Sequence, residues 1–148
     1  MDIGSGTGYP SAALSNFAPH GFEIDGVQCA SMEGFLQSLK FSSPEMQEHV
    51  CTLVGKAAKF KGKKKKWFRE QTLYWRGNPI KRDSDEYQEL ITRAYDAMFL
   101  NTKFRAALAA TGKATLTHSM GKNKINETVL TEREFMQQLN RLRNQING

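Results

Sequence analysis

Apolar residues between positions 31 and 41 recur with the period of an α-helix. Their spacing of i, i+3, i+4 and i+7 forms one apolar face, which we expect to pack against a core. Ser31 stands directly before this run and is a suitable N-cap. A polar stripe made by Glu33, Gln37 and Lys40 lies on a neighbouring face of the same helix. The residues of the apolar face are Met32, Phe35, Leu36 and Leu39.

Two further helices are predicted in the middle of the chain. Ser43 is a suitable cap and Pro44 favours the first helical position. We therefore expect one helix from there to Val54, with a further turn or two through residues 56–60. The other covers residues 83–101, with Asp83 or Ser84 as its cap. Its apolar face consists of Tyr87, Leu90, Ile91, Ala94 and Met98.

The last part of the chain predicts two more helices. Residues 102–112 are rich in alanine and end at Gly112, the residue type most often found just after a helix. The final helix has the clearest start, because Thr131 and Glu134 have the spacing of a capping box and Leu130 can form a hydrophobic staple with Phe135. Its buried stripe consists of Phe135, Leu139, Leu142 and Ile146.

Short extended segments separate these helices. The Asp-Gly pair at 25–26, between two short apolar runs, is typical of a tight hairpin turn. A second extended pair is expected around the Gly-Asn-Pro turn at 77–79. Residues 114–119 have the composition of a strand, residues 120–128 that of a polar loop, and residues 1–13 are expected to be irregular. The predicted class is α+β and mainly helical, with no alternation of strands and helices that would make a parallel sheet.

The composition fits one soluble globular domain over residues 1–148. A chain of 148 residues with 39% hydrophobic residues can bury one core. The sequence contains no apolar run near the roughly 18 residues of a membrane helix, and its start lacks the basic and apolar parts of a signal peptide. We expect a cytoplasmic protein, in the host cytoplasm if it is viral, with no membrane partner. The composition leaves the oligomeric state open.

Common motifs for cofactors, metals and nucleophilic serines are absent from the sequence. It has no Walker loop, no HExxH and no GxSxG. Cys29 and Cys51 are too few for a disulfide framework and are not part of a Cys/His cluster. We therefore expect two buried thiols, no metal and no cofactor.

Positive charge is concentrated in one segment. The formal net charge is +6, and six lysines lie within the eight residues from Lys59 to Lys66. Such a run attracts phosphate backbones, and the aromatic residues Trp67 and Phe68 that follow it are suited to stacking on a base. A solvated loop and a small DNA-associated protein without enzymatic activity are the alternatives. The candidate contacts to nucleic acid are Lys63, Lys64, Lys65 and Lys66.

A few polar residues interrupt apolar segments and are candidates for chemistry. On an ideal helix, Glu33 and Lys40 are about 10.5 Å apart along the axis, so they do not form a simple salt bridge, although Gln37 between them can link them. Burial would lower the pKa of Lys40 and favour its nucleophilic amine, and it would raise the pKa of Glu33 towards that of a proton carrier. His118 can contact a phosphate or ribose hydroxyl. The pattern alone also allows a solvated helix face and a structural histidine.

The segments at 14–26 and 31–41 resemble the paired SNF and E-x-x-x-Q-x-x-K-F signatures of the YbiA-like, or NADAR, superfamily. Residues 82–101, 108–112 and 116–139 are similar to later blocks of the same superfamily. Each fragment alone is weak, whereas their order and spacing are specific. The resemblance covers nearly the whole chain from Leu14 onward.

The resemblance implies a YbiA-like fold and hydrolysis of an N-glycosidic bond without a cofactor. It implies Lys40 as the nucleophile that attacks the anomeric carbon and Glu33 as the acid/base partner. It also implies that Asn16 orients ribose hydroxyls. The candidate substrate-binding residues are Ser15, Asn16, Phe17, Gln37, Trp75, His118 and Gly121; a core position is the alternative for Trp75.

Two branches of this superfamily suggest two substrates. One removes the base from ribosylamino-pyrimidine phosphates of riboflavin synthesis, and the other removes ADP-ribose from modified guanine in nucleic acid. The first branch has a Trp-Gly segment near its end, whereas this sequence has no tryptophan after Trp75. We therefore expect an ADP-ribosyl-guanine hydrolase whose partner is ADP-ribosylated nucleic acid, with reversal of a toxin or phage-defence modification as an extension. The alternatives are the riboflavin-type N-glycosidase and a module that binds ADP-ribose or a similar nucleotide without cleaving it.

Overall fold

The computed structural model describes residues 1–147 and confirms the α+β, mainly helical class. No helix formed by these residues is long and apolar enough to cross a membrane. The α-helices are α1 (Ser11–Leu14), α2 (Met32–Ser38), α3 (Pro44–Cys51), α4 (Gly55–Lys63), α5 (Asp85–Met98), α6 (Thr102–Ala110) and α7 (Glu132–Asn147). A 3-10 helix, η1, covers Trp67–Arg69, and the strands are β1 (Phe22–Ile24), β2 (Val27–Cys29), β3 (Thr72–Trp75) and β4 (Asn78–Lys81).

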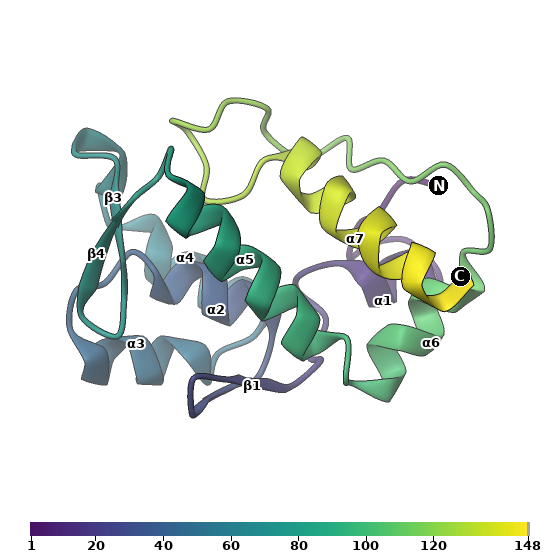
Figure 1. Ribbon diagram of the computed structural model, residues 1–148, viewed down its shortest axis with the longest axis horizontal. Helices are drawn as coiled ribbons and strands as arrows, with labels where there is room; N and C mark the ends of the chain where they lie inside the picture. The colour runs from purple at the N-terminus through teal and green to yellow at the C-terminus, as the bar shows by residue number, and fades with distance from the viewer. Residues whose placement is uncertain (148) are drawn as a thin grey trace.

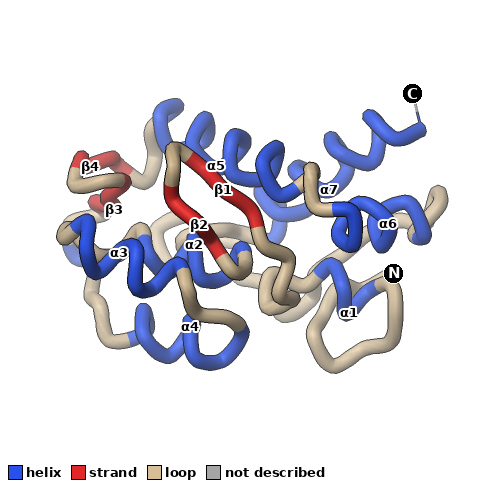
Figure 2. The backbone as a smooth tube through the Cα atoms, turned by 90° about the horizontal axis from the view of Figure 1, so that it is seen from below, coloured by secondary structure: helices blue, strands red, loops and turns tan. Residues whose placement is uncertain are grey.

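Helix α5 crosses the middle of the molecule and joins its two parts (Figure 1). On one side α2 packs against α3, α4 and α5, with the two hairpins at the edges. On the other side α6 contacts α1 and α7, and α7 also contacts α5. The view from below shows the β1–β2 hairpin lying across α5 and α2 (Figure 2). One hydrophobic core runs through both parts and contains residues from every α-helix except α4, as well as from all four strands.

Helix α2 is the element that the sequence describes best. Its predicted apolar face is buried at all four positions, and the Ser31 hydroxyl caps the helix by accepting from the Gly34 N–H at 3.0 Å. The helix ends at Ser38, so Lys40 lies in the turn that follows and not on the helix itself. Gly34 is required because a Cβ there would lie 2.5 Å from the Leu53 carbonyl oxygen, where α2 passes the end of α3.

Both predicted hairpins are present, but the second turns one residue earlier than expected. In the first, Asp25 and Gly26 have φ values of 50° and 79°, as a tight two-residue turn requires. In the second, Trp75 pairs with Asn78, so the turn consists of Arg76 and Gly77, with φ values of 52° and 84°. The proline at 79 has its φ fixed near −65° and cannot occupy such a turn; it lies within β4 instead.

Three other expectations about local structure need correction. The segment 1–13 is not wholly irregular, since α1 begins at Ser11. Residues 114–119 do not form a strand, because only Thr117 pairs, through an isolated parallel bridge to Asp2. Helix α3 ends at Cys51, and α4 then runs to Lys63, beyond the expected turn or two. Residues 52–54 separate α3 from α4, and Gly55, the first residue of α4, has a φ of 53°, outside the helical region.

The predicted caps of the later helices are confirmed, although α5 ends at Met98 and not at residue 101. Ser84, and not Asp83, caps α5, because its hydroxyl accepts from the Tyr87 N–H at 3.1 Å. Gly112 follows α6 with a φ of 57°. At the start of α7, the Glu134 N–H donates to the Thr131 hydroxyl and the Thr131 N–H donates to Glu134 Oε1. The loop at 120–128 has no helix or strand, as expected.

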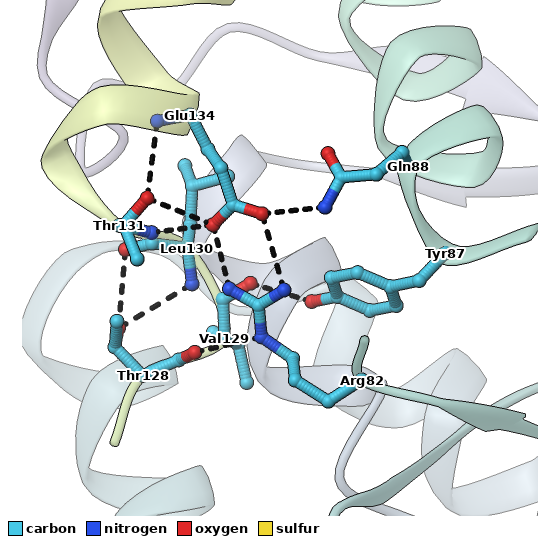
Figure 3. Close-up of polar contacts among 8 residues, drawn as sticks. All are labelled: Arg82, Tyr87, Gln88, Thr128, Val129, Leu130, Thr131 and Glu134. Atoms are coloured by element: carbon cyan, nitrogen blue, oxygen red, sulfur yellow. Dashed lines mark hydrogen bonds and ion pairs between the residues drawn. The ribbon is translucent and has the colours of Figure 1, made fainter. Parts of the chain in front are cut away.

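A buried ion pair joins the end of β4 to α7 (Figure 3). Arg82 is 1% exposed and donates to both carboxylate oxygens of Glu134, at 2.6 and 3.1 Å. Gln88 of α5 also donates to Glu134, at 2.6 Å, and Arg82 Nε donates to the Thr128 carbonyl at 2.9 Å. This network fixes the segment before α7 against α5, and nothing in the sequence pattern indicated it.

Candidate active site

The polar stripe of α2 faces α4. Gln37 Nε2 donates to Glu33 Oε1 at 3.0 Å, so the first half of the predicted link is present. The other half is not formed, because Gln37 Oε1 lies against Gly62 of α4 and accepts no hydrogen bond from residues 1–147. Lys40 Nζ instead makes a long contact of 3.5 Å with the Gly62 carbonyl oxygen. Within the described chain, Glu33 and Lys40 therefore lie near one another without forming an ion pair.

The turn at residues 15–17 lies beside the start of α2. The Asn16 carbonyl accepts from the Glu33 N–H at 3.0 Å, which anchors the turn to the helix. The Asn16 side-chain oxygen accepts from the Tyr95 hydroxyl at 2.7 Å, which leaves its amide N–H groups for other partners. The Ser15 hydroxyl accepts from the Phe17 N–H at 3.2 Å and thereby shapes the turn. All three residues of the turn are half-buried.

His118 reaches the same region from the segment after α6. Its Nδ1 lies 2.7 Å from the Ile3 carbonyl, and its ring packs edge-on against Phe135 with 5.2 Å between centroids. A carbonyl only accepts, so Nδ1 carries the proton and Nε2 of the neutral ring is left as an acceptor. The backbone N–H of His118 donates to the Glu132 carboxylate at 3.1 Å. The ring is close enough to Glu33 for its charge to affect that carboxylate.

Gly121 has no side chain and so leaves room for the His118 ring. Its N–H donates to the His118 carbonyl at 3.0 Å, which closes the turn. A Cβ at this position would lie 2.7 Å from His118 Cδ2 and 3.2 Å from Glu132 Cβ. Gly121 is therefore placed to position the imidazole, and its own contact with a ligand remains an expectation.

Burial moves the pKa values of the two principal groups in opposite directions. It raises the pKa of Glu33, although the hydrogen bond from Gln37 and the charges of Lys59 and Lys40 oppose the change. Burial lowers the pKa of Lys40; Glu33 opposes this, and the positive charges of Lys122 and Lys59 add to it. The protonated carboxyl and the neutral amine are both favoured relative to free side chains. A carboxyl group and an amine whose pKa values are shifted towards each other thus lie in one region.

Three residues of this region were not identified from the sequence. Tyr95 has the spacing of an apolar helix face, and its bond to Asn16 appears only in the fold. Lys59 was counted in the lysine run but not assigned to the site, and Lys122 lies in a loop without periodicity. No group of three or more His, Cys, Asp or Glu side chains within residues 1–147 is arranged to hold a metal ion.

Trp75 lies apart from this cluster. Its indole is 6% exposed, packs edge-on against Phe35 with 5.1 Å between centroids, and donates to Asp25 at 2.8 Å. Phe35 belongs to the apolar face of α2, whereas Glu33 and Lys40 belong to the polar stripe. The structure therefore gives Trp75 a role in joining the two hairpins to the core, and it does not bring the indole to the other candidate substrate-binding residues.

The lysine run ends α4 and continues into the following turn. Lys63 is in the last turn of the helix, and lysines 64–66 follow it; all four side chains are exposed. Trp67 is 8% exposed and belongs to the core, so it is not a free platform for a base. Phe68, in contrast, is 50% exposed.

We expect Gly62→Ala to reduce the activity of this site while the fold persists. The new Cβ would overlap Gln37 Oε1 and lie 2.8 Å from Gln37 Cδ, which forces the amide away from Glu33. Misplacing such a group can cost up to about 10²-fold in rate. Alanine favours a helix over glycine, so α4 itself should not weaken. The rate and melting temperature should be compared with those of Gly8→Ala, where a Cβ meets no atom within 4 Å; equal rates in the two variants would contradict the expectation.

The arrangement of elements defines a YbiA-like fold. The solution structure of the E. coli protein YbiA superposes on this chain with a TM-score of 0.64, covering 99% of this chain and 84% of that one. The two sequences are 20% identical, so this likeness concerns the fold. A protein of Enterobacteria phage T4, described as an uncharacterized 17.1 kDa protein in the Gp30-rIII intergenic region, is 40% identical over 149 residues, which cover 99% of this chain and 98% of the phage protein.

Residues 8–144 match the family described as bacteriophage protein GP30.3. The match spans most of the chain and includes α2, α4 and the His118 segment. This chain belongs to the bacteriophage GP30.3 family.

Proposed function

We propose that this protein is an N-glycosyl hydrolase that removes ADP-ribose from ADP-ribosylated guanine in nucleic acid. The observation that carries the proposal is the proximity of Glu33, which accepts from Gln37, to Lys40, with the pKa of the carboxyl raised and that of the amine lowered by burial. Breaking a ribosyl C–N bond requires a proton for the departing base and a group that stabilises or captures the cationic sugar carbon. Glu33 and Lys40 have the protonation preferences for these two tasks.

The proposed reaction uses Lys40 as a covalent nucleophile. Its neutral amine attacks the anomeric carbon, the C–N bond to guanine breaks, and the bonding electron pair passes to the guanine nitrogen. Glu33 donates a proton to that nitrogen, so guanine leaves intact. The attached nitrogen gives a proton back to the Glu33 carboxylate, which passes it to the ring oxygen as the ring C–O bond breaks and a protonated imine forms. Water adds to the imine carbon, one of its protons passes to the nitrogen, and the C–N bond to Lys40 breaks, which releases ADP-ribose and the amine.

The neighbouring polar groups are suited to holding the ribose. Asn16 has its side-chain oxygen occupied by Tyr95, so its amide can donate to a ribose hydroxyl. His118 Nε2 can accept from a second hydroxyl while Nδ1 remains on the Ile3 carbonyl. Because neither group forms a metal or nucleophile motif, we assign both to substrate orientation.

A polymeric substrate is supported by the charge of the chain. The net charge of +6 favours polyanions in general, and the lysine run adds a local concentration of charge next to the candidate site. Membership of a phage family suggests that the protein acts in the cytoplasm of an infected bacterium, where modification of nucleic acid by a toxin or defence enzyme would be its target.

The decisive experiment is to incubate the purified protein with an oligonucleotide carrying one ADP-ribosylated guanine. We expect free ADP-ribose and the unmodified oligonucleotide, both identified by mass spectrometry. A ribosylamino-pyrimidine phosphate is the comparison substrate. Faster turnover of that compound would replace the proposed substrate by the riboflavin-type one. Saturable binding of the oligonucleotide without product on prolonged incubation would show a binding module.

The rate should follow a bell-shaped dependence on pH, with both limbs set by the altered groups. The pKa of Glu33 is raised above its usual 4.5, and the fraction of Glu33 that can donate a proton falls as pH rises through it. The pKa of Lys40 is lowered below its usual 10.5, and the fraction with a neutral amine rises as pH rises through it. The active fraction is the product of these two fractions. Both limbs should therefore lie between these two usual values.

Glu33→Gln should lower kcat by about 10²- to 10⁴-fold and remove the limb that belongs to Glu33. A rate–pH profile measured on both proteins checks this. A change in kcat of only a few-fold, with both limbs retained, would mean that Glu33 is a polar residue of the helix surface without a role in proton transfer.

A further inference from the structure

Lys40 is one of the residues that line a basic hollow of about 300 Å³. The other lining residues come from the turn after α2, the segment after α4, η1 and β3. The cations of the lining are Lys40, the last two lysines of the run, Lys65 and Lys66, and Arg69, with Glu70 as the one carboxylate among the described lining residues. Ser42, Thr72 and Tyr74 also line it.

The four candidate lysines are not equivalent. Lys65 and Lys66 line the hollow, and the Lys65 ammonium also lies 5.2 Å from the centroid of the Phe41 ring. Lys63 and Lys64 are not part of its lining, and the Lys64 ammonium lies over Phe60 on α4, 5.0 Å from the ring centroid. The run therefore divides into an inner pair, Lys65 and Lys66, and an outer pair, Lys63 and Lys64.

The chemistry of the lining is that of a phosphate-binding groove. Besides the proposed nucleophile Lys40, three cationic side chains against one carboxylate select an anion, and the hydroxyl groups of Ser42 and Tyr74 can supply further donors to phosphate oxygens. A hollow of about 300 Å³ is at the small end of ligand pockets and is too small for a duplex. The adjacent aromatic side chains Tyr74, half-buried, and Phe68, half-exposed, are available for base stacking next to a backbone track.

We propose that this hollow binds the phosphodiester backbone of single-stranded nucleic acid immediately beside the reacting nucleotide. The inference rests on the proposed function and specifies its substrate as an unpaired strand. Lys40 lines the hollow and is also the proposed nucleophile, so a strand seated there brings its modified guanine to the amine. In a duplex that guanine would be paired and stacked, and reaching the amine would require it to be flipped out.

The test compares two double variants with the same change of charge. Lys65→Ala/Lys66→Ala removes the inner pair, and Lys63→Ala/Lys64→Ala removes the outer pair; all four side chains are exposed, so both variants should fold. Binding of an unmodified single-stranded oligonucleotide is measured by fluorescence anisotropy over a series of salt concentrations. Removing a lysine that neutralises one phosphate lowers the slope of log K against log salt by about 0.7.

We expect the inner variant to lose about 1.4 from this slope and at least about tenfold in affinity at low salt, and the outer variant to lose much less of both. Equal losses would overturn the proposal in favour of diffuse attraction to the lysine run. Binding of duplex as tight as that of single strand, with the same losses, would overturn the choice of an unpaired strand.

A turnover assay separates the strand from the ADP-ribose group as the source of the phosphate. For the inner variant, kcat/KM on the ADP-ribosylated oligonucleotide should fall about tenfold more than on ADP-ribosyl-guanosine. Equal falls would assign the hollow to the pyrophosphate of ADP-ribose and overturn the proposal. The binding measurement needs no turnover, so it tests the strand site separately from the hydrolase. A protein without hydrolase activity whose inner and outer variants still differ in affinity and salt slope would contradict the proposed function and support the strand site.

Discussion

Lys40→Met is expected to abolish turnover, with a loss of at least about 10³-fold in kcat, because removal of a nucleophile leaves only binding and electrostatic contributions. The thioether of methionine is close in length to the lysine side chain but carries no amine. Burial lowers the pKa of Lys40 and so increases the fraction of neutral, nucleophilic amine. We therefore expect a larger loss of rate here than for an exposed lysine. Initial rates on the ADP-ribosylated oligonucleotide measure the effect. Lys103→Met, which removes an exposed lysine of α6, is the control and should retain full activity.

Lys40→Arg and chemical trapping distinguish a covalent role from a charge role. Arginine keeps the positive charge but stays protonated, so it cannot attack the anomeric carbon. If Lys40 forms an imine, borohydride added during turnover should reduce it to a stable adduct of the ADP-ribosyl mass at residue 40. An active Lys40→Arg enzyme, with no adduct in the parent protein, would reduce the role of Lys40 to neutralising a phosphate.

Arg82→Met is expected to cost about 3–5 kcal/mol of unfolding free energy, because it leaves the Glu134 carboxylate without the cation that compensates its burial. For a protein of this size, this corresponds to a fall of about 6–20 °C in melting temperature. The change should be measured by urea and thermal denaturation. Arg141→Met is the matched control: its partner Asp96 is 52% exposed at the side chain, and such surface pairs contribute at most about 1 kcal/mol. Similar losses in both variants would contradict the importance of burial.

The contribution of Glu134 should also depend on pH. Burial alone would raise the pKa of this carboxyl, but hydrogen bonds from Arg82, the Thr131 N–H and Gln88 outweigh it and lower the pKa below the usual 4.5. A lowered pKa in the folded state means that the ionised form stabilises the fold above about pH 4.5 and that this stabilisation is lost as pH falls further. Glu134→Gln keeps a side chain that can complete the cap. Its stability deficit relative to the parent protein should therefore be larger at pH 7 than at pH 3.5.

The sequence predicts helices well here because their signals are local. Ser31 and the apolar face of α2 lie within eleven residues, and the structure confirms both the cap and the burial. The turn of the second hairpin was predicted one residue too late, because Gly-Asn-Pro is a strong turn signal. The actual turn contains Arg76 at positive φ, which the residue type does not indicate. The Arg82–Glu134 pair joins residues 52 positions apart, and no periodicity links them.

The candidate site could be predicted only in part. Glu33, Gln37 and Lys40 share one short segment, so their common face follows from helical spacing, and the resemblance to a known superfamily suggested their chemistry. Tyr95 could not be found in this way, because its hydroxyl meets Asn16 across 79 positions. Trp75 was a candidate for substrate binding with a core position as its alternative, and its side chain is buried between the hairpins and the core.

The contact between His118 and the Ile3 carbonyl has a consequence for how the site is assembled. Glu33, Gln37 and Lys40 are placed by α2 and the turn that follows it, which need only near neighbours in the chain. His118 takes its place only when segments 115 residues apart meet, and closing so long a loop carries an entropic cost that local contacts do not share. A fragment that contains the α2 signature but ends before residue 118 therefore carries Glu33 and Lys40 without the imidazole.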